Sequence, residues 1–186
     1  GMNARSAIFQ TLVKALEIRD YITEGHTDRL QSSVRAMAEA LGLPDRVIKD
    51  LQLLAYFHDI GKVGIPDYIL FKEGKLTEDE CRIMQRHCEI GHRIALSAPE
   101  LTIISDWILK HHEWWDGHGY PLGLRGEEIP LECRILSIAD AYDAMTNYRS
   151  YRPTRTHQEA VEELRRQAGS QFDPDLVKVF IELIES

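Results

Sequence analysis

Apolar side chains recur at helical spacing along most of this chain of 186 residues. Val47, Leu51 and Leu54 are one example, because residues three to four positions apart lie on one face of an α-helix. The alternation of polar and apolar residues that is typical of strands is hard to find. The pattern predicts an all-α fold, a compact bundle of about seven to nine helices.

Residues that begin or end helices stand at suitable places in this pattern. A threonine followed three residues later by a glutamate can form a capping box, an aspartate before a proline can cap a first turn, and a glycine can stop a helix. The predicted ends are capping boxes at Thr77 and Glu80 and at Thr156 and Glu159, a cap at Asp173 before Pro174, and stops at Gly42 and Gly169.

The main interruption of the helical pattern is the segment DGHGYPLGLRGEEIP, residues 116–130. Its four glycines and two prolines cannot sustain a helix. The segment is therefore predicted to be a long loop, and long loops within compact domains are often functional.

Size and composition exclude several classes of protein. The length predicts one domain, residues 1–186, and the net charge of -8 argues against binding to nucleic-acid polymers, so an anionic substrate would need local cations. Three cysteines without a C-x-x-C pair do not predict a disulfide framework or a thiolate zinc site. No apolar run approaches the ~20 residues of a membrane span, and the start lacks a signal-peptide core. We expect a cytoplasmic protein, or the cytoplasmic part of a larger one.

Histidine and aspartate residues interrupt the helical pattern at a few places. The segment HDIGK, residues 58–62, ends the helix-like run RVIKDLQLLAYF, and Asp140 lies within the apolar run LSIADAYDAM. A carboxylate among apolar neighbours needs a partner, because burying an unpaired charge is too costly. The candidate partners elsewhere in the chain are His26, His87 and the adjacent pair His111 and His112.

Two of these sites are doublets, His58 with Asp59 and His111 with His112. Adjacent residues of a helix point roughly 100° apart, so each doublet can direct ligands to two different points. Two doublets suggest two metal ions, and nitrogen and oxygen donors suit iron, manganese or zinc in a hydrolytic centre. Asp59 can bridge ions roughly 3.5–4 Å apart, which favours hydrolysis of a phosphoester. Taken singly, each histidine is more often structural than a ligand.

Three longer segments of the chain resemble a known protein family. HDIGKVGIPD, HHEWWDGHGYPLGLRGEEIPLECRILSIADAYDAM and YRSYRP resemble the HD-GYP family of cyclic di-GMP phosphodiesterases, within the HD phosphohydrolase superfamily. The resemblance covers nearly the whole chain and preserves the order and approximate spacing of the motifs. A His-Asp doublet without the other motifs would indicate only the wider superfamily.

The resemblance implies roles for individual residues. Lys62 resembles the family lysine that contacts the scissile phosphate, although a lysine at a helix C-terminus can also simply meet the helix dipole. Arg149 and Arg152 stand where the family has phosphate-binding cations, and without the resemblance both would be assigned to a solvated loop. For Asp59 the resemblance implies a catalytic role as well as a role as ligand. The implied metal ligands, all intact, are His26, His58, Asp59, His87, His111, His112 and Asp140.

Gly119, Tyr120 and Pro121 form the GYP motif itself, for which a role in shaping the loop is favoured over direct catalysis. Tyr120 is also a candidate to bind substrate. Aromatic rings can stack on guanine, and about half of the candidate rings are expected to belong to the core instead. These candidates are Trp114, Trp115, Tyr120 and Tyr151. We expect Glu113 and Asp116 to accept hydrogen bonds rather than bind metal, and His92, His118 and His157 to be structural or exposed.

Three positions depart from the family pattern. Ile22 stands where members with a third metal have a glutamate, so the chain is predicted to bind two metal ions. Cys88 replaces a proline that often follows the third histidine, and His118 replaces a smaller polar residue. Neither of these two changes removes a predicted ligand.

The resemblance implies a metal-dependent phosphodiesterase of bacterial signalling that hydrolyses cyclic di-GMP by attack of a metal-bound hydroxide, with pGpG as the product and GMP as the alternative end product. Iron and manganese are the implied metals, with zinc or nickel as alternatives in purified protein. A diguanylate cyclase of the GGDEF type and a fused or upstream sensory or receiver domain are the implied partners.

Two alternatives stay open. A non-catalytic receptor for cyclic di-GMP, or a module that binds a GGDEF partner, would be favoured by degenerate ligands, and none is seen. An HD phosphohydrolase of another nucleotide is disfavoured by the GYP loop, although a shared fold does not exclude it.

Overall fold

The computed structural model describes the chain except for residues 1–3, 20–24 and 148–151. The predicted all-α fold is confirmed, since the described residues form helices and two isolated β-bridges but no strand. The α-helices are α1 Ala4–Arg19, α2 His26–Ala40, α3 Asp45–Phe57, α4 Asp67–Leu70, α5 Glu78–Gln85, α6 His87–Ser97, α7 Ser105–Lys110, α8 Leu131–Thr146, α9 His157–Gln167 and α10 Pro174–Glu185. Short 3-10 helices are η1 Ile60–Gly64, η2 Thr102–Ile104 and η3 Gly126–Glu128.

The described helices exceed the predicted number because α4 and α7 are very short. α4 has four residues and α7 has six, too few for a clear apolar period in the sequence.

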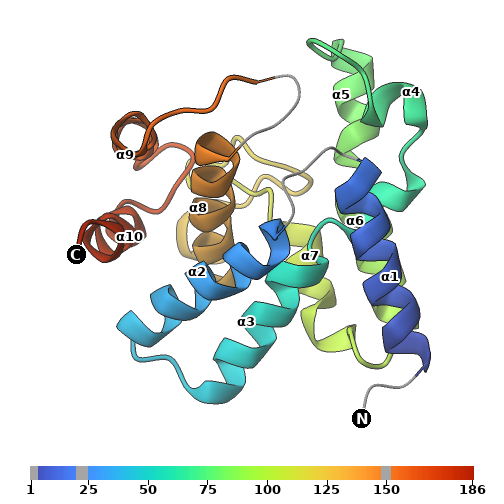
Figure 1. Cartoon of the computed structure of the whole chain (residues 1–186), viewed down its shortest axis with the longest axis horizontal. Helices are drawn as coiled ribbons and strands as arrows, with labels where there is room; N and C mark the ends of the chain where they lie inside the picture. The colour runs from blue at the N-terminus through green and yellow to red at the C-terminus, as the bar shows by residue number, and fades with distance from the viewer. Residues whose placement is uncertain (1–3, 20–24, 148–151) are drawn as a thin grey trace.

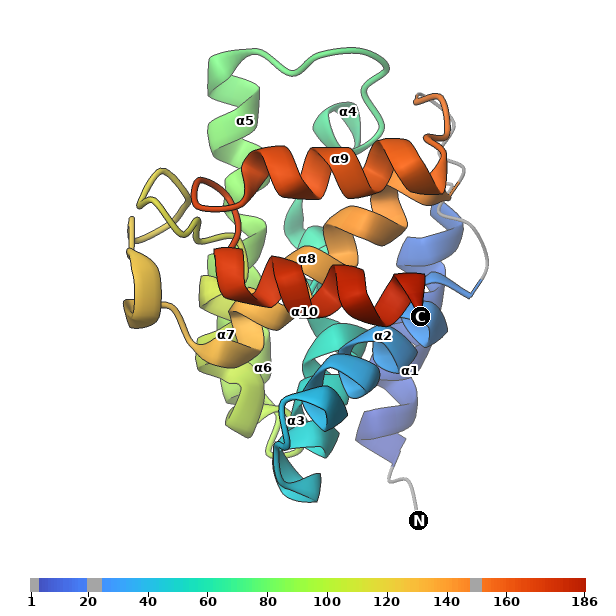
Figure 2. The ribbon, with the colours of Figure 1, turned by 90° about the vertical axis from the view of Figure 1, so that its left-hand side faces the viewer.

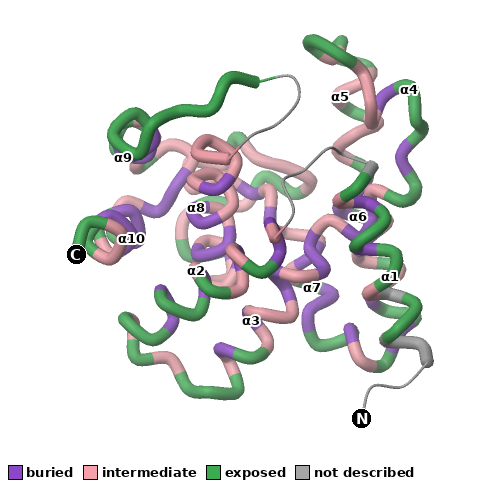
Figure 3. Tube along the Cα trace, viewed as in Figure 1, coloured by how far each residue is buried: buried purple, intermediate pink, exposed green. Residues whose placement is uncertain are grey.

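The long helices pack around one core. In Figure 1, α9 and α10 lie on one side and α1, α4, α5 and α6 on the other, with α2, α3 and α7 between them. Figure 2 shows α9 and α10 side by side across α8, which they also contact. Figure 3 shows buried residues on the inner faces of these helices, whereas α5 has no buried residue. Core side chains include Leu30, Val34, Leu51, Leu54, Ile108, Ile135, Leu136, Leu164 and Phe180.

The predicted helix ends are confirmed. Both threonines form complete capping boxes, in which each hydroxyl accepts a hydrogen bond from the backbone N–H of the glutamate three residues later. The Asp173 carboxylate accepts from the first turn of α10, and Gly42 and Gly169 end α2 and α9 with φ angles of 70° and 89°. The side-chain caps Thr77, Thr156 and Asp173 satisfy backbone N–H groups that lack partners within the helix. Each of these caps contributes about 1 kcal/mol to stability.

The predicted loop at residues 116–130 is also confirmed, since η3 is the only helix within this fully described segment. None of the helices in the described part of the chain combines the length and apolar character that a membrane span requires.

A close contact between η1 and α6 brings two predicted ligands together. A Cβ atom on Gly61 would lie 1.8 Å from the carbonyl oxygen of His87 and 2.5 Å from the backbone nitrogen of Gly91. Only glycine fits there without moving backbone. Because η1 follows Asp59 directly and α6 begins at His87, this contact places the Asp59 carboxylate beside the His87 ring.

Candidate metal centre

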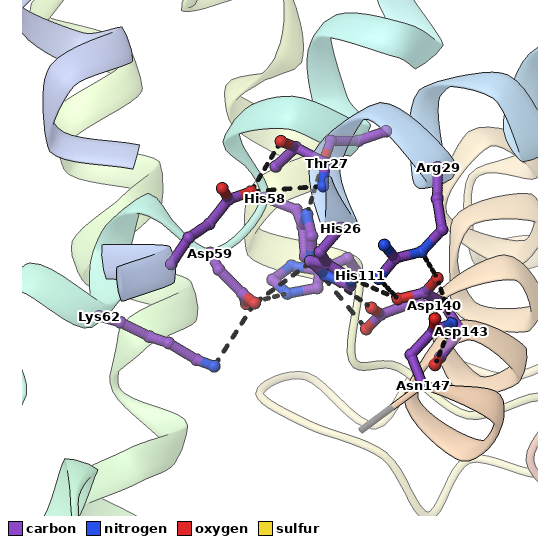
Figure 4. A network of polar contacts seen from close by, with 12 residues as sticks. His26, Thr27, Arg29, His58, Asp59, Lys62, His111, Asp140, Asp143 and Asn147 are labelled. Carbon is purple, nitrogen blue, oxygen red and sulfur yellow. Dashed lines mark hydrogen bonds and ion pairs between the residues drawn. The ribbon is translucent and has the colours of Figure 1, made fainter. Parts of the chain in front are cut away.

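The predicted ligands come from five helices or their ends. His26 begins α2, His58 and Asp59 follow α3, His87 begins α6, His111 and His112 follow α7, and Asp140 lies within α8. The fold brings all seven into one cluster, part of which is shown in Figure 4. Their positions agree with the predicted ligand set, whose role in binding metal stays a prediction.

The donor atoms fall into two groups. His26, His58 and Asp140 form one group, and His87, Cys88, His111 and His112 form the other. Within each group, one nitrogen, oxygen or sulfur atom per residue lies within 4.8 Å of the others. The cluster thus offers two groups of donors. The doublet of His111 and His112 does not divide between two points as predicted, because both residues belong to the same group.

Asp59 lies between the two groups. Its Oδ2 atom is 3.3 Å from Nε2 of His58, and its Oδ1 atom is 3.6 Å from Nε2 of His87 and 3.8 Å from Nε2 of His111. Each carboxylate oxygen therefore faces a different group. Burial would raise the pKa of Asp59, but His58 and Lys62 lower it well below its usual range, so the carboxylate is ionised and suited to bind cations.

Three of the histidines are oriented by the same local device. Each follows the last turn of a short or medium helix, where backbone carbonyls lack partners within the helix. Each Nδ1–H donates to the carbonyl three residues earlier, which makes Nε2 the nitrogen directed toward the cluster. The bonds run from His58 to Ala55 at 2.8 Å, from His87 to Met84 at 2.8 Å and from His111 to Ile108 at 2.6 Å.

The fourth orienting group is Asp143, which the sequence analysis missed. Nδ1 of His26 lies 2.5 Å from Oδ2 of Asp143, whose Oδ1 accepts hydrogen bonds from Arg29 at 2.6 Å and from Asn147 at 3.0 Å. Burial would raise the pKa of Asp143, but the hydrogen bonds with His26 and Arg29 lower it. The available signal was its spacing, because Asp143 follows Asp140 by three residues and so lies near the same face of α8.

The buried imidazole nitrogens of the cluster indicate that it is suited to bind metal ions. Nε2 of His26, of His58 and of His111 is buried and makes no hydrogen bond with the described residues. A buried polar atom without a partner costs about 1–3 kcal/mol, so three in one cluster indicate ligand positions. Burial lowers the pKa of His87 to about 4, which keeps its imidazole neutral, the form that binds metal. Burial also opposes charge on His58, but Asp59 and Asp140 outweigh it and raise its pKa to about 9, so without metal Nε2 of His58 holds a proton that a bound ion would replace.

Glu113 anchors the GYP loop beside the cluster of predicted ligands. Its buried carboxylate accepts hydrogen bonds from the backbone N–H groups of Leu122, Gly123 and Leu124 at 2.6, 3.0 and 3.1 Å. This geometry agrees with the expectation that Glu113 is an acceptor. Asp116 likewise accepts from the backbone of His118 at 3.0 Å.

The GYP motif packs against His112. A Cβ atom on Gly119 would lie 2.2 Å from the backbone nitrogen of Trp114, so a larger residue would push the loop away. The backbone N–H of Tyr120 donates to the carbonyl of His112, and the Tyr120 ring stacks on the His112 ring at 5.0 Å between centroids and 15° between planes. These contacts favour the expected shaping role of Gly119, Tyr120 and Pro121, and Tyr120 thereby supports a predicted ligand.

Two adjoining pockets extend from the cluster. A pocket of about 140 Å³ is lined by His111, His112 and Asp140, and one of about 310 Å³ is lined by Arg152 and Arg155. Both are lined by Ala141, Ala144 and Gln171, so they meet along one side of α8. Neither Arg155 nor Gln171 was among the predicted site residues.

The remaining predicted residues divide among several places. Nζ of Lys62 is 3.4 Å from Oδ2 of Asp59. Figure 4 marks this ion pair with a dashed line. Trp114 lines the smaller pocket, whereas the ring of Trp115 is covered by the Arg134 guanidinium at 5.8 Å. The predictions for Ile22, Arg149 and Tyr151 lie outside the described residues.

The histidines predicted to lie outside the site do so. Nδ1–H of His92 donates to the Ser105 carbonyl at 2.7 Å, His157 contacts Tyr142, and His118 is exposed beside Asp116.

Comparisons with known proteins agree with this geometry. The family model for the HD domain matches residues 10–176. A cyclic di-GMP phosphodiesterase of Thermotoga maritima is 39% identical over 178 residues, which cover 95% of this chain and 48% of that protein. The cyclic di-GMP phosphodiesterase response regulator RpfG of Xanthomonas campestris is 41% identical over 173 residues, which cover 91% and 46%. The chain thus spans about half the length of the curated relatives it matches.

Solved structures share the fold. A cyclic GMP-AMP specific phosphodiesterase of Vibrio cholerae superposes with a TM-score of 0.73 at 22% identity, over 96% of this chain and 48% of that one. An HD-GYP-type protein of Bdellovibrio bacteriovorus superposes with a TM-score of 0.68 at 19% identity, over 87% and 52%. At these identities the likeness concerns the fold alone. The family match and the relatives at 39% and 41% identity confirm the resemblance to the HD-GYP phosphodiesterases and show that this chain belongs to the HD domain family.

Proposed function

We propose that this chain is a metal-dependent phosphodiesterase that hydrolyses cyclic di-GMP at a centre of two metal ions, with pGpG as the product and GMP as the alternative end product. The observation that carries the proposal is the position of Asp59, whose two carboxylate oxygens face two separate groups of imidazoles at 3.3 to 3.8 Å. A carboxylate that faces both groups is placed to bind two ions at once, and two neighbouring ions can act together on one phosphodiester.

Some residues would bind the metal ions at such a centre, and others would hold the ligand side chains in position. The seven predicted ligands would hold the ions, and Asp143 would keep the His26 ring in place. The chemistry that a metal pair supplies is activation of water for in-line attack on phosphorus and neutralisation of the phosphate oxygens. Glu113 and the GYP loop keep His112 in position from the other side.

The chain has a net charge of -8, so an anionic substrate would be bound by the cationic side chains that lie near the centre. Lys62 lies beside Asp59 and can place its compact charge on the scissile phosphate, where it stabilises the developing charge of the transition state. Arg152 and Arg155 line the second pocket and can contact the other phosphate of a cyclic dinucleotide. Arg149 has the same proposed role from the family resemblance.

The names of the relatives support a cyclic dinucleotide as the substrate and suggest 3'3'-cGAMP as a second substrate to test beside cyclic di-GMP. Those of Thermotoga maritima and Xanthomonas campestris are named for cyclic di-GMP, whereas a Vibrio cholerae relative that is 38% identical over 173 residues is named a 3'3'-cGAMP-specific phosphodiesterase. Both substrates are cyclic dinucleotides with two phosphodiesters. The family resemblance is the basis for three further proposals, which are iron or manganese as the native metal, a GGDEF-type partner and a fused sensory domain. The proposed extent of the domain, residues 1–186, rests on the length of the chain.

Metal analysis and turnover on the same samples test the proposal. Protein purified without oxygen should contain close to two transition-metal ions per chain and hydrolyse cyclic di-GMP faster than 3'3'-cGAMP. The Asp59→Ala variant should lose metal and lose more than ~100-fold in rate, the upper end of what losing an outer-shell partner of a metal ligand costs. The control Asp79→Ala changes an exposed carboxylate on α5 and should behave as wild type. Full metal content without hydrolysis of either dinucleotide would refute the proposed activity.

A further inference from the structure

Cys88 places a buried thiol among the imidazoles of one ligand group. Its Sγ atom lies 3.8 Å from Nε2 of His87, and the donor atoms of Cys88, His87, His111 and His112 all lie within 4.8 Å of one another. The side chain is fully buried. The family resemblance treats this cysteine only as a replacement for proline, so the position of its sulfur is a property of this chain.

A hydrogen bond does not explain this position well. Thiols are weak donors, and the contact with His87 is at the long end of the range for sulfur. Cys133 offers a contrast, because its buried Sγ–H donates to the carbonyl of Trp107 at 3.3 Å. A second observation points to a ligand at the same place, since Nε2 of His111 is buried, faces this group and makes no hydrogen bond with the described residues.

The spacing of sulfur and nitrogen fits shared binding of one ion. Zinc binds sulfur at about 2.3 Å and imidazole nitrogen at about 2.0–2.1 Å, which at a tetrahedral angle places the two donors about 3.6 Å apart. The observed separation of 3.8 Å between Cys88 and His87 is close to that value. A metal ion also removes the proton from a thiol that it binds, so the ligand would be a thiolate.

We propose that Cys88 is a ligand to the ion held by His87, His111 and His112, in addition to the nitrogen and oxygen ligands of the proposed centre. The inference rests on the proposed function, because it assumes that this group binds a metal. It makes the two metal positions unequal. The group of His26, His58 and Asp140 has only nitrogen and oxygen donors, whereas the Cys88 group has a soft donor that favours zinc, cobalt or ferrous iron over manganese.

Spectroscopy of the metal-loaded protein tests the ligand directly. Wild-type protein loaded with Co²⁺ should show a thiolate-to-cobalt charge-transfer band in the near ultraviolet, and zinc-loaded protein should show a sulfur neighbour at about 2.3 Å by X-ray absorption. Cys88→Ala and Cys88→Ser should lose both signals. Cys133→Ala, which removes a buried thiol outside either ligand group, should keep them.

The outcomes separate this inference from the proposed function. Cobalt bound at two ions per chain without a thiolate band in wild type, or a band that persists in Cys88→Ser, would overturn the inference, and hydrolysis of cyclic di-GMP by the same samples would leave the proposed function intact. Failure of wild type to bind cobalt or zinc at all would overturn both. A wild-type spectrum without a thiolate band overturns the inference even where a variant folds poorly.

Metal preference gives an independent readout. Cys88→Ser should weaken zinc binding by at least ~10-fold, the lower end of the loss expected for outer-shell partners, and weaken manganese binding by less. Equal losses for both metals would contradict a soft ligand at this position.

Discussion

Four histidines of the centre are oriented by a hydrogen bond at Nδ1, the ring nitrogen that faces away from the proposed metals. Three imidazoles are fixed by carbonyls at helix ends, and His26 is fixed by Asp143 from a helix 117 residues later in the chain. The carbonyl bonds are local and follow from the position of each histidine after a helix. The bond to Asp143 is different, because it depends on the packing of α2 against α8.

Asp143 should therefore control metal affinity without being a ligand. Asp143→Asn keeps the shape of the side chain but weakens the hold on His26 and removes the charge that faces Arg29. We expect metal affinity to fall by about 10–100-fold, as it does for outer-shell partners of metal-binding histidines. Titration with a metal-sensitive dye measures this. The control Asp79→Asn removes an exposed charge on α5, and an equal loss in that variant would contradict the role.

The lowered pKa of Asp143 also predicts an acid-dependent stability of metal-free protein. A carboxyl group with a lowered pKa in the folded state stabilises the fold above its unfolded pKa of roughly 3.9, and that stability is lost as pH falls through the folded-state pKa. Urea unfolding should show stability decreasing below about pH 4, and Asp143→Asn should show a smaller decrease. Parallel curves for the two proteins would show that Asp143 does not contribute.

Lys62 should act on rate rather than on metal content. Lys62→Ala removes a cation 3.4 Å from Asp59 but none of the predicted ligands. We expect two metals to remain bound and hydrolysis of cyclic di-GMP to slow by about 10²–10³-fold, as when one group that stabilises a transition-state charge is removed. Lys49→Ala, an exposed lysine of α3, is the control. Loss of metal in Lys62→Ala would assign Lys62 to holding Asp59 instead.

Among the helices, the contact between η1 and α6 decides whether Asp59 and His87 meet. Two glycines of η1 face α6 in different ways. A Cβ atom on Gly61 would meet backbone atoms at 1.8 and 2.5 Å, whereas a Cβ atom on Gly64 would meet the flexible end of the Ile90 side chain at 2.9 Å. The two positions thus form a matched pair for substitution.

Gly61→Ala should separate these elements. We expect it to reduce the free energy of unfolding by about 1–3 kcal/mol or more and to weaken metal binding, because backbone must shift to admit the methyl group. Gly64→Ala should cost less than about 1 kcal/mol, since the Ile90 side chain can rotate away. Urea unfolding and metal titration of both variants measure the difference. Similar stabilities for the two variants would show that the contact is not tight.

For the molecule as a whole, the proposed metal pair joins parts that are far apart in the sequence. Its ligands come from α2, from the ends of α3 and α7, from α6 and from α8. The apolar core lies between the same helices and contains none of the seven predicted ligands. Removing metal should therefore loosen the fold without unfolding it.

Chelation tests this expectation. At a metal concentration of about 100 times the Kd, binding stabilises the folded state by about 2.7 kcal/mol, so metal removal should lower Tm by about 5–10 °C in a chain of this size. Far-ultraviolet circular dichroism should show helical protein before the transition in both states, and added metal should restore the higher Tm. A Tm that does not respond to the chelator would contradict binding of the ions to the folded state.

Much of the helical structure could be predicted because its signals are local. Capping boxes at Thr77 and Thr156 and the stop at Gly42 act within one turn of the helix that they end, so a short stretch of sequence contains the whole interaction. The family motifs added the ligand set, and the structure brings those residues together. The substrate, the metals and the catalytic roles stay predictions.

Local patterns were sufficient for the helices, the long loop and the list of candidate ligands, since each depends on residues that are close along the chain. Packing was needed for the role of Asp143, the tight approach at Gly61, the sulfur of Cys88 within a ligand group and the pockets along α8. The physical reason is that these features depend on which faces of distant helices meet. A helical period shows that a residue lies on a face, but close packing of many side chains selects the face that it contacts.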